Sequence, residues 1–182
     1  MKKENYLGVN VSPYTYEEII NEIRNRMTIG EQSTVIAVNP EKIMASQKNE
    51  LVKQLINEST FQIPDGVGVL LASKLKRGNI RSRVTGVEMM EKLVEFAAKE
   101  NHRVFLYGAK EEVVTKAKQN LEARFGEGFI VGYSNGYEKD QSALIQKIQQ
   151  SNANMIFVAL GSPTQELWIR ENMPILTGVK VF

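Results

Sequence analysis

Residues 60–68, Thr-Phe-Gln-Ile-Pro-Asp-Gly-Val-Gly, end an apolar run with a carboxylate and a glycine-rich turn. The run stops at Pro64, Asp65 follows, and two glycines free the backbone to turn before an apolar helix predicted over residues 67–75. This order predicts a strand that carries an acid to the edge of a sheet. Asp65 stands out because the chain has only one other aspartate, Asp140. The alternative is that Asp65 only caps the helix after it.

Apolar and β-branched runs on both sides of this stretch predict further strands. They alternate with helical patterns, which favours right-handed crossovers and an α/β, Rossmann-like fold, a mostly parallel sheet with helices on both faces. The predicted strands cover residues 6–11 at an edge, then 34–38, 60–63, 103–107, 129–133 and 155–160, with the first half of another at 179–182.

Helix starts are marked by capping residues. Thr15-Tyr-Glu-Glu18 and Thr85-Gly-Val-Glu88 are capping boxes. Asn39 is placed as an N-cap before Pro40, and the helical pattern behind it continues to residue 56. Asp140 is assigned to capping the helix that follows it.

The composition excludes several classes of protein. A length of 182 residues predicts one domain. A net charge of +2 is too small to indicate a nucleic-acid binder. The absence of cysteine excludes disulfides and thiolate chemistry, and His102 is the only histidine. No apolar run approaches the ~20 residues that span a bilayer, so the sequence predicts a cytoplasmic protein.

Several polar or glycine-rich turns follow the predicted strands directly. In a parallel sheet such turns lie on one rim, where ligands bind. Helix starts at Pro40 and Pro163 suit a phosphate, and Arg81 and Arg83 add positive charge. The rim residues are Asn39, Asp65, Gly108, Gly136, Tyr137 and residues 161–165.

The stretch between Gly66 and Val87 is basic. It contains no acidic residue, whereas Lys74, Lys76, Arg77, Arg81 and Arg83 accumulate there. A solvated turn between two helices is the simple interpretation of each cation taken alone.

Common catalytic motifs are absent from the sequence. There is no Gly-x-x-x-x-Gly-Lys-[Ser/Thr] loop, and Gly66-Val-Gly68 lacks the third glycine of a dinucleotide fingerprint. No Gly-x-Ser-x-Gly elbow supports a serine hydrolase. With two aspartates far apart, no Asp-x-Asp pair exists to hold a divalent metal, so backbone and arginine would have to neutralise a diphosphate.

Five motifs together resemble the WecG/TagA/CpsF glycosyltransferases, in order and spacing, over essentially the whole chain. They are Asn39-Pro-Glu-Lys-Ile43, Pro64-Asp-Gly-Val-Gly68, Arg83-Val-Thr-Gly86, Leu106-Tyr-Gly-Ala109 and Ala159-Leu-Gly-Ser-Pro-Thr-Gln-Glu166 with Trp168-Ile169.

The resemblance implies an E-type glycosyltransferase fold and a metal-independent, inverting transferase without a cofactor. Such an enzyme moves a sugar from a UDP donor to an undecaprenyl-diphosphate-linked sugar at the inner membrane face. The TagA branch of the family implies N-acetylmannosamine, lipid-linked N-acetylglucosamine and wall teichoic acid. The residues leave the oligomeric state open between a monomer and a homo-oligomer.

The same resemblance implies roles for individual residues. Asp65 would be the general base, and Arg83 would contact a diphosphate. Asn39 and Gln165 would orient the sugars, although Ser162-Pro-Thr-Gln165 also fits a capping box. The other expected substrate contacts are Thr85, Gly108, Gly136 and Tyr137, of which Gly136 and Tyr137 would border the nucleoside.

The chain departs from the family pattern at three places. Ala37 stands where many relatives have threonine, and Thr164 stands where they usually have lysine or arginine. The family also continues past Phe182 with a glycine-rich turn and a basic tail that reaches the membrane. This difference predicts a truncated catalytic domain with weak or absent activity.

Two other functions remain open on the residues alone. One is a different Rossmann-like enzyme, an oxidoreductase or nucleotide hydrolase, which the α/β pattern allows. The other is a non-catalytic binding domain of the same fold. Binding of UDP without magnesium, and no binding of NAD, distinguishes the transferase from the first.

Overall fold

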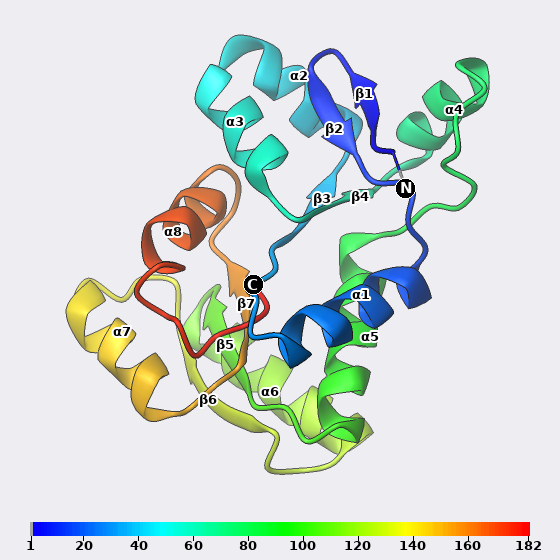
Figure 1. Cartoon of the computed structure of the whole chain (residues 1–182). Helices are drawn as coiled ribbons and strands as arrows, with labels where there is room; N and C mark the ends of the chain where they lie inside the picture. The colour runs from blue at the N-terminus through cyan, green and yellow to red at the C-terminus, as the bar shows by residue number, and fades with distance from the viewer. Residues whose placement is uncertain (1) are drawn as a thin grey trace. The chain divides into compact units, whose positions relative to one another are not determined.

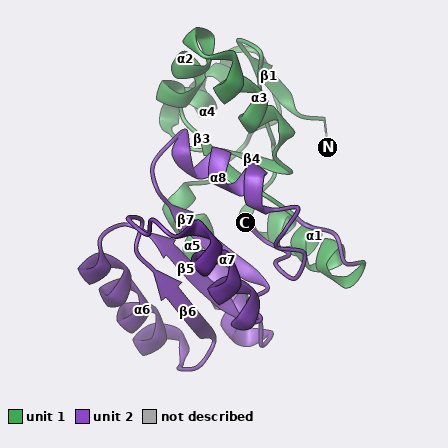
Figure 2. Cartoon of the chain, turned by 90° about the vertical axis from the view of Figure 1, so that its left-hand side faces the viewer, with its two compact units in different colours: residues 1–29, 33–92 green, residues 30–32, 93–182 purple. Residues whose placement is uncertain are grey.

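The computed structural model describes residues 2–182, which divide into two compact units (Figure 2). Among the described residues, unit 1 comprises 2–29 and 33–92, and unit 2 comprises 30–32 and 93–182. Figure 1 labels the elements in chain order. Helix α5, Gly86–Lys99, begins in unit 1 and ends in unit 2.

Unit 1 contains the strand that ends at Asp65. Strands β3 and β4 pair in parallel, with Val38 opposite Pro64, so both strands end at the same edge. The predicted strands at 34–38 and 60–63 and the helix over residues 67–75 are confirmed. The elements are β1 Glu4–Tyr6, β2 Val9–Val11, α1 Tyr16–Thr28, β3 Val35–Val38, α2 Pro40–Lys48, α3 Glu50–Glu58, β4 Phe61–Pro64 and α4 Val67–Leu75.

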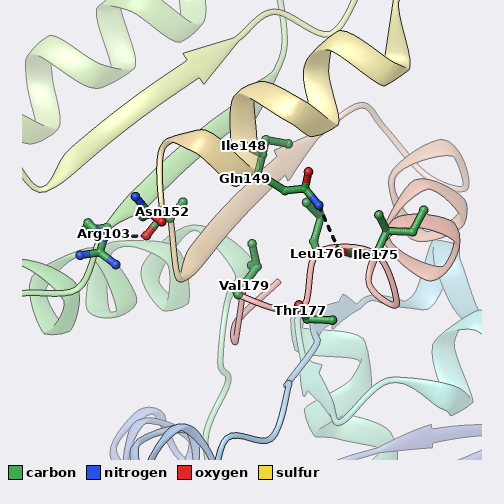
Figure 3. Close-up of a pocket in the computed structure, with 10 residues that line it drawn as sticks. Arg103, Ile148, Gln149, Asn152, Ile175, Leu176, Thr177 and Val179 are labelled. Atoms are coloured by element: carbon green, nitrogen blue, oxygen red, sulfur yellow. Dashed lines mark hydrogen bonds between the residues drawn. The ribbon is translucent and has the colours of Figure 1, made fainter.

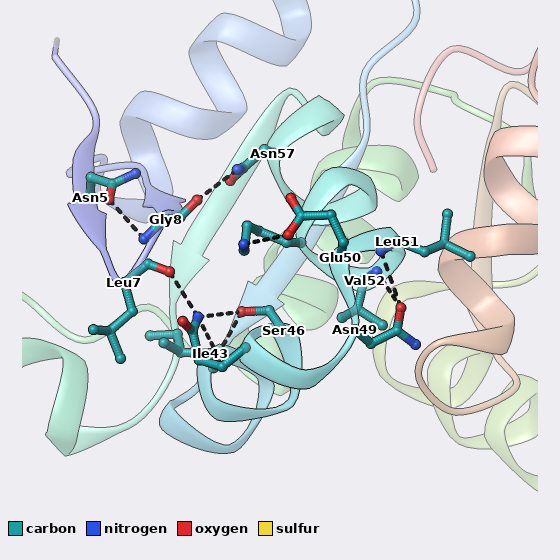
Figure 4. Close-up of polar contacts among 12 residues, drawn as sticks. Asn5, Leu7, Gly8, Ile43, Ser46, Asn49, Glu50, Leu51, Val52 and Asn57 are labelled. Atoms are coloured by element: carbon teal, nitrogen blue, oxygen red, sulfur yellow. Dashed lines mark hydrogen bonds and ion pairs between the residues drawn. The ribbon is translucent and has the colours of Figure 1, made fainter.

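The prediction of one edge strand over residues 6–11 is wrong, because these residues belong to a hairpin. Strands β1 and β2 pair antiparallel, and the chain reverses at Leu7 and Gly8, whose φ angles are 52° and 86°. Figure 4 shows how the turn is held: Gln47 Nε2 donates to Leu7 O at 2.8 Å, and Asn57 Nδ2 donates to Gly8 O at 2.8 Å. Contacts with α2 and α3, distant in sequence, therefore stabilise the turn.

The single helix predicted from Pro40 to residue 56 is two helices. Asn49 separates them with an extended backbone, φ −142° and ψ 99°. Its side chain accepts hydrogen bonds from Leu51 N and Val52 N, at 3.1 and 3.4 Å, and so caps α3 (Figure 4). An asparagine inside an apolar periodicity thus acts as a helix start.

Gln62 is a fully buried polar residue in the middle of β4. Its Nε2 donates to Ile56 O at 2.9 Å and to Ser59 O at 2.6 Å, and its Oε1 accepts from Ser12 Oγ at 3.2 Å. Because every polar atom of the amide has a partner, burial is tolerated and β4 is fixed to the segments on either side.

Unit 2 contains a parallel sheet in the order β6-β5-β7. The predicted last strand is reduced to one parallel bridge, Met155 to Val181, with Ile156 N donating to Val181 O at 2.9 Å. The elements are β5 Val104–Gly108, α6 Glu111–Phe125, β6 Ile130–Ser134, α7 Gln141–Gln150, β7 Met155–Ala159 and α8 Thr164–Asn172.

The two crossovers of unit 2 run in opposite directions across the sheet. Helix α6 leads to β6 at one edge, and α7 leads from there to β7 at the other, so right-handed crossovers put the two helices on opposite faces. Phe105 and Tyr107 pack in one cluster with residues of α7 and α8. Val104 and Leu106 alternate with them and are buried on the other face, where α6 packs. The predicted α/β fold with parallel strands is confirmed.

Candidate active site

The carboxylate of Asp65 lies at the end of β4 beside the start of helix α5. Its Oδ2 accepts a hydrogen bond from Gly86 N at 3.1 Å, and Arg83 lies 3.7 Å from its Oδ1. A helix N-terminus and a guanidinium both complement a negative charge. The Asp65 side chain remains 25% exposed, so a substrate hydroxyl can reach it.

The alternative that Asp65 caps the helix after it is wrong. The N-cap of α4 is Gly66, which has no side-chain cap, and its φ of 106° lies in the region that favours glycine. The carboxylate instead binds the first residue of a helix 21 positions further along the chain. This arrangement frees Asp65 from α4 and turns it toward the segment that carries Arg83.

Asn39 follows β3 at the edge where Asp65 follows β4. As predicted, its Oδ1 caps α2, accepting from Lys42 N at 2.8 Å, and Pro40 is the first helical residue. The glycines after Asp65 pack against this helix start: a Cβ on Gly68 would lie 2.7 Å from Pro40 Cγ. Asn39 and Asp65 are therefore held together by strand pairing and by a close backbone approach.

Thr85 lies at the start of α5, and its predicted capping role is confirmed in part. Its Oγ1 accepts from Glu88 N at 3.2 Å, but its backbone N–H donates to the hydroxyl of Tyr16, at 2.8 Å, and not to Glu88. The Tyr16 hydroxyl donates in turn to the Glu88 carboxylate. Tyr16 therefore positions the segment next to Asp65, and no motif in the sequence signals this.

The two titratable groups of this network shift in opposite directions. Burial, and then the hydrogen bond to Glu88, raise the pKa of Tyr16. The hydrogen bonds from Tyr16 and then from Thr85 lower the pKa of Glu88. Both shifts favour a neutral phenol donating to an ionised carboxylate.

Unit 2 has a cavity of about 400 Å³ at the carboxyl ends of its strands. Tyr107, Gly136 and Leu160, at or just beyond the ends of β5, β6 and β7, all line it. The connections diverge between β5 and β7, which is where ligands bind in open α/β sheets. The remaining lining residues are Glu138, Gln141, Thr164, Trp168, Glu171 and Asn172.

Two aromatic rings and an amide form one side of this cavity. The rings of Tyr107 and Trp168 lie 4.9 Å apart, and Trp168 Nε1 donates to Gln141 Oε1 at 2.8 Å. Gln141 Nε2 lies 3.5 Å from the Tyr107 hydroxyl. Gln141 was missed by the sequence reasoning, because a glutamine in the first turn of a helix carries no signal of its own.

Two predicted glycines lie where backbones approach closely. A Cβ on Gly108 would lie 2.3 Å from Ala159 O, and one on Gly136 would lie 2.9 Å from Leu160 Cδ2. Gly136 N also donates to Ala109 O at 2.8 Å, which joins the ends of β5 and β6. Tyr137 is 71% exposed and is not among the residues that line the cavity.

Gln165 lies in the first turn of α8, next to the cavity residue Thr164. The predicted capping box from Ser162 is wrong, because the N-cap is Pro163 and no side chain caps the helix. Gln165 N donates to Gly161 O at 2.9 Å, and its side-chain Nε2 donates to Glu166 Oε1 at 3.4 Å. A sugar-binding role of the Gln165 side chain stays a prediction.

A second cavity in unit 2, of about 300 Å³, lies at the opposite ends of the strands (Figure 3). Arg103 precedes β5 and Ala153 precedes β7, and both line it. Arg103 Nε donates to Asn152 O at 2.6 Å across one side. None of the predicted site residues lies there.

The predicted site residues thus form two groups. Asn39, Asp65, Arg83 and Thr85 lie together in unit 1, and Gly108, Gly136, Tyr137 and Gln165 lie in unit 2. That the two groups share one rim stays a prediction. Within residues 2–182, no cluster of three or more histidine, aspartate or glutamate side chains could hold a metal ion.

Comparisons with known proteins identify the family. A family model described as "Glycosyl transferase WecG/TagA/CpsF family" matches residues 4–182. The N-acetylglucosaminyldiphosphoundecaprenol N-acetyl-beta-D-mannosaminyltransferases of Bacillus subtilis and Bacillus spizizenii are each 35% identical over 137 residues, or 75% of this chain. The match spans about half of these relatives, 54% and 53% of their lengths. The chain belongs to the WecG/TagA/CpsF family of glycosyltransferases.

Proposed function

We propose that the two units form one catalytic domain of an inverting glycosyltransferase. Its donor is a UDP-sugar, with N-acetylmannosamine as the sugar, and its acceptor is undecaprenyl-diphosphate-linked N-acetylglucosamine in cell-wall polymer synthesis. The family match and the names of the two Bacillus relatives support this reaction.

The partly exposed carboxylate of Asp65 is the observation that carries the proposal. It accepts the proton of the acceptor hydroxyl while that oxygen forms a bond to the anomeric carbon of the donor. The bond from that carbon to UDP breaks on the opposite side, so the configuration inverts. General base catalysis of this kind contributes roughly 10²–10⁴-fold to a rate.

Arg83 and the helix N-termini supply the positive charge for a diphosphate. Arg83 is half exposed and lies beside Asp65, so its guanidinium can contact a diphosphate of the substrates. Asn39, Thr85 and Gln165 orient the sugars. We propose that no metal takes part, because the two aspartates of the chain, 65 and 140, are too far apart in the sequence to form an Asp-x-Asp pair.

The aromatic cavity of unit 2 is proposed to hold the nucleoside. A uracil ring suits the side formed by Tyr107 and Trp168, and its polar edge suits the Gln141 amide. Gly108, Gly136 and Tyr137 border this position. Since the acceptor is a lipid, the protein is proposed to work in the cytoplasm against the inner face of the membrane. Within the described chain, none of the helices combines the length and the apolar character needed to cross a bilayer.

A donor screen tests the reaction. UDP-sugars are incubated with a short-chain lipid-diphosphate-N-acetylglucosamine analogue, with EDTA present, and products are detected by mass. The screen uses the 182-residue chain. We expect the mass of a disaccharide product from UDP-N-acetylmannosamine in EDTA.

Calorimetric titrations with UDP and with NAD, both without magnesium, are the matched binding experiment. We expect heat from UDP only. Binding of NAD in place of UDP, or product formation only after magnesium is added, would contradict the proposal.

A further inference from the structure

Helix α4 exposes a stripe of apolar side chains that neither the core nor the proposed reaction uses. Val67, Leu71 and Leu75 are 58%, 54% and 85% exposed. Their spacing of four residues places them on one face of the helix. Val69 and Ser73 lie on the buried side, so the helix is anchored and the stripe faces solvent.

Exposed cations lie within and just after the helix that carries this stripe. Between Gly66 and Val87 the chain carries five cations and no acid. Arg83 pairs with Asp65, and Lys76 donates to Asn5 O at 3.3 Å and lies over the Tyr6 ring. Within residues 2–182, the structure gives no ion pair to the other three cations, which are exposed: Lys74, Arg77 and Arg81.

Glu4, an acid from β1, lies at the end of α4, and its carboxylate accepts hydrogen bonds there. Glu4 Oε1 accepts from Ile80 N at 2.9 Å and from Ser73 Oγ at 3.2 Å. Burial opposes its ionisation, but hydrogen bonds from Tyr6 and from the backbone of Asn79 and Ile80 lower its pKa overall. The Glu4 carboxylate therefore accepts hydrogen bonds from the loop backbone and, in the described part of the chain, forms no ion pair with Lys74, Arg77 or Arg81.

We propose that the α4 surface, formed by Val67, Leu71, Leu75, Lys74, Arg77 and Arg81, docks on an anionic lipid bilayer. Apolar side chains that enter the headgroup boundary, flanked by cations that bind lipid phosphates, are the two components of interfacial binding. A second copy of the chain fits this surface poorly, because a two-fold contact would place the same cations opposite one another.

Docking would orient the candidate base. Asp65 precedes α4 by two residues, and the helix spans only about 13 Å at 1.5 Å per residue. The carboxylate would then lie within reach of a headgroup-bound acceptor. The inference does not depend on the proposed function, because lipid binding requires neither the donor nor Asp65.

Co-sedimentation of residues 1–182 with phosphatidylglycerol vesicles tests the proposal. We expect binding that weakens with added salt and is much weaker with phosphatidylcholine vesicles. The double variant Leu71→Gln with Lys74→Gln should bind phosphatidylglycerol vesicles roughly 50-fold more weakly, since it removes one inserting side chain and one cation. Leu75→Gln alone should weaken binding roughly 10-fold.

The matched control is Val113→Gln with Lys116→Gln on α6. Val113 is 51% exposed, a fraction similar to the 54% of Leu71. Val113 and Lys116 are three residues apart on one helix, as Leu71 and Lys74 are. The control and Asp65→Asn should bind vesicles like the unmodified chain. No binding by the unmodified chain, or equal losses in both double variants, overturns the proposal. The proposal is also overturned if sedimentation velocity shows a dimer that Leu75→Gln abolishes while vesicle binding persists.

Discussion

Unit 1 and unit 2 prepare their functional groups by different means. In unit 1, a carboxylate is held by a backbone N–H and an arginine, so charge and hydrogen bonding define the site. In unit 2, a cavity is formed by packed rings and by backbones in close approach, so shape defines it. The difference suggests that chemistry belongs to unit 1 and nucleotide recognition to unit 2, and that substitutions can separate the two.

The largest expected effect is on catalysis in unit 1. Asp65→Asn should lower the transfer rate roughly 10²–10⁴-fold, because the amide cannot accept the acceptor proton. UDP affinity, measured by calorimetry, should stay unchanged. Asp140→Asn is the matched control, since Asp140 caps α7 through Ala143 N at 2.9 Å and asparagine caps equally well. Equal rates in the two variants would remove Asp65 from the mechanism.

The next effect is on the shape of unit 2. Gly108→Ala should lower the free energy of unfolding by about 2–4 kcal/mol, because the new Cβ would meet Ala159 O and the φ of 131° strains any other residue. Urea unfolding measures this loss. Gly178→Ala is the control, as its Cβ would find nothing within 4 Å. If both variants were equally stable, the close approach of β5 and β7 would not contribute to the free energy of unfolding.

A smaller effect concerns the pH dependence of unit 1. Burial, and then the hydrogen bond to Glu4, raise the pKa of Tyr6 to about 12. A raised pKa stabilises the fold fully below the unfolded value near ~10, and the contribution disappears as pH rises through the folded value.

The difference in unfolding free energy between the unmodified chain and Tyr6→Phe should therefore shrink between pH 10 and about 12, by on the order of 2 kcal/mol. Chemical denaturation across this range measures it. Tyr137→Phe, at a tyrosine that is 71% exposed, is the matched control for the loss of a phenol hydroxyl. A flat difference for Tyr6→Phe would contradict the role of burial.

The smallest effect tests the aromatic cavity. Trp168→Phe keeps a ring beside Tyr107 but removes the donor to Gln141, so UDP affinity should fall roughly 5-fold, or about 1 kcal/mol. In a Gln141→Met background the same substitution should add little, because the shared hydrogen bond is already lost. Unchanged UDP affinity in every variant would place the nucleoside elsewhere.

Local chemistry explains which predictions were confirmed. The capping box at Thr15, the cap and proline at Asn39 and Pro40, and the cap at Asp140 all involve groups within four residues. One error had the opposite origin, because the β1–β2 turn is held by Gln47 and Asn57, which are distant in the sequence. The other error concerns a local cap, because Asn49 starts a helix inside a continuous apolar pattern that hides the break.

Apart from the β1–β2 hairpin and the break at Asn49, the sequence by itself determined the order of strands and helices, the strand that ends in Asp65, and the motifs that place the chain in its family. Only the tertiary structure decided which groups meet: Asp65 with Gly86, Tyr16 with Thr85, and Trp168 with Gln141. The reason is physical. Periodicity and capping are set by neighbouring residues, whereas these hydrogen bonds join residues 21, 69 and 27 positions apart, which only the packing of the whole unit brings together.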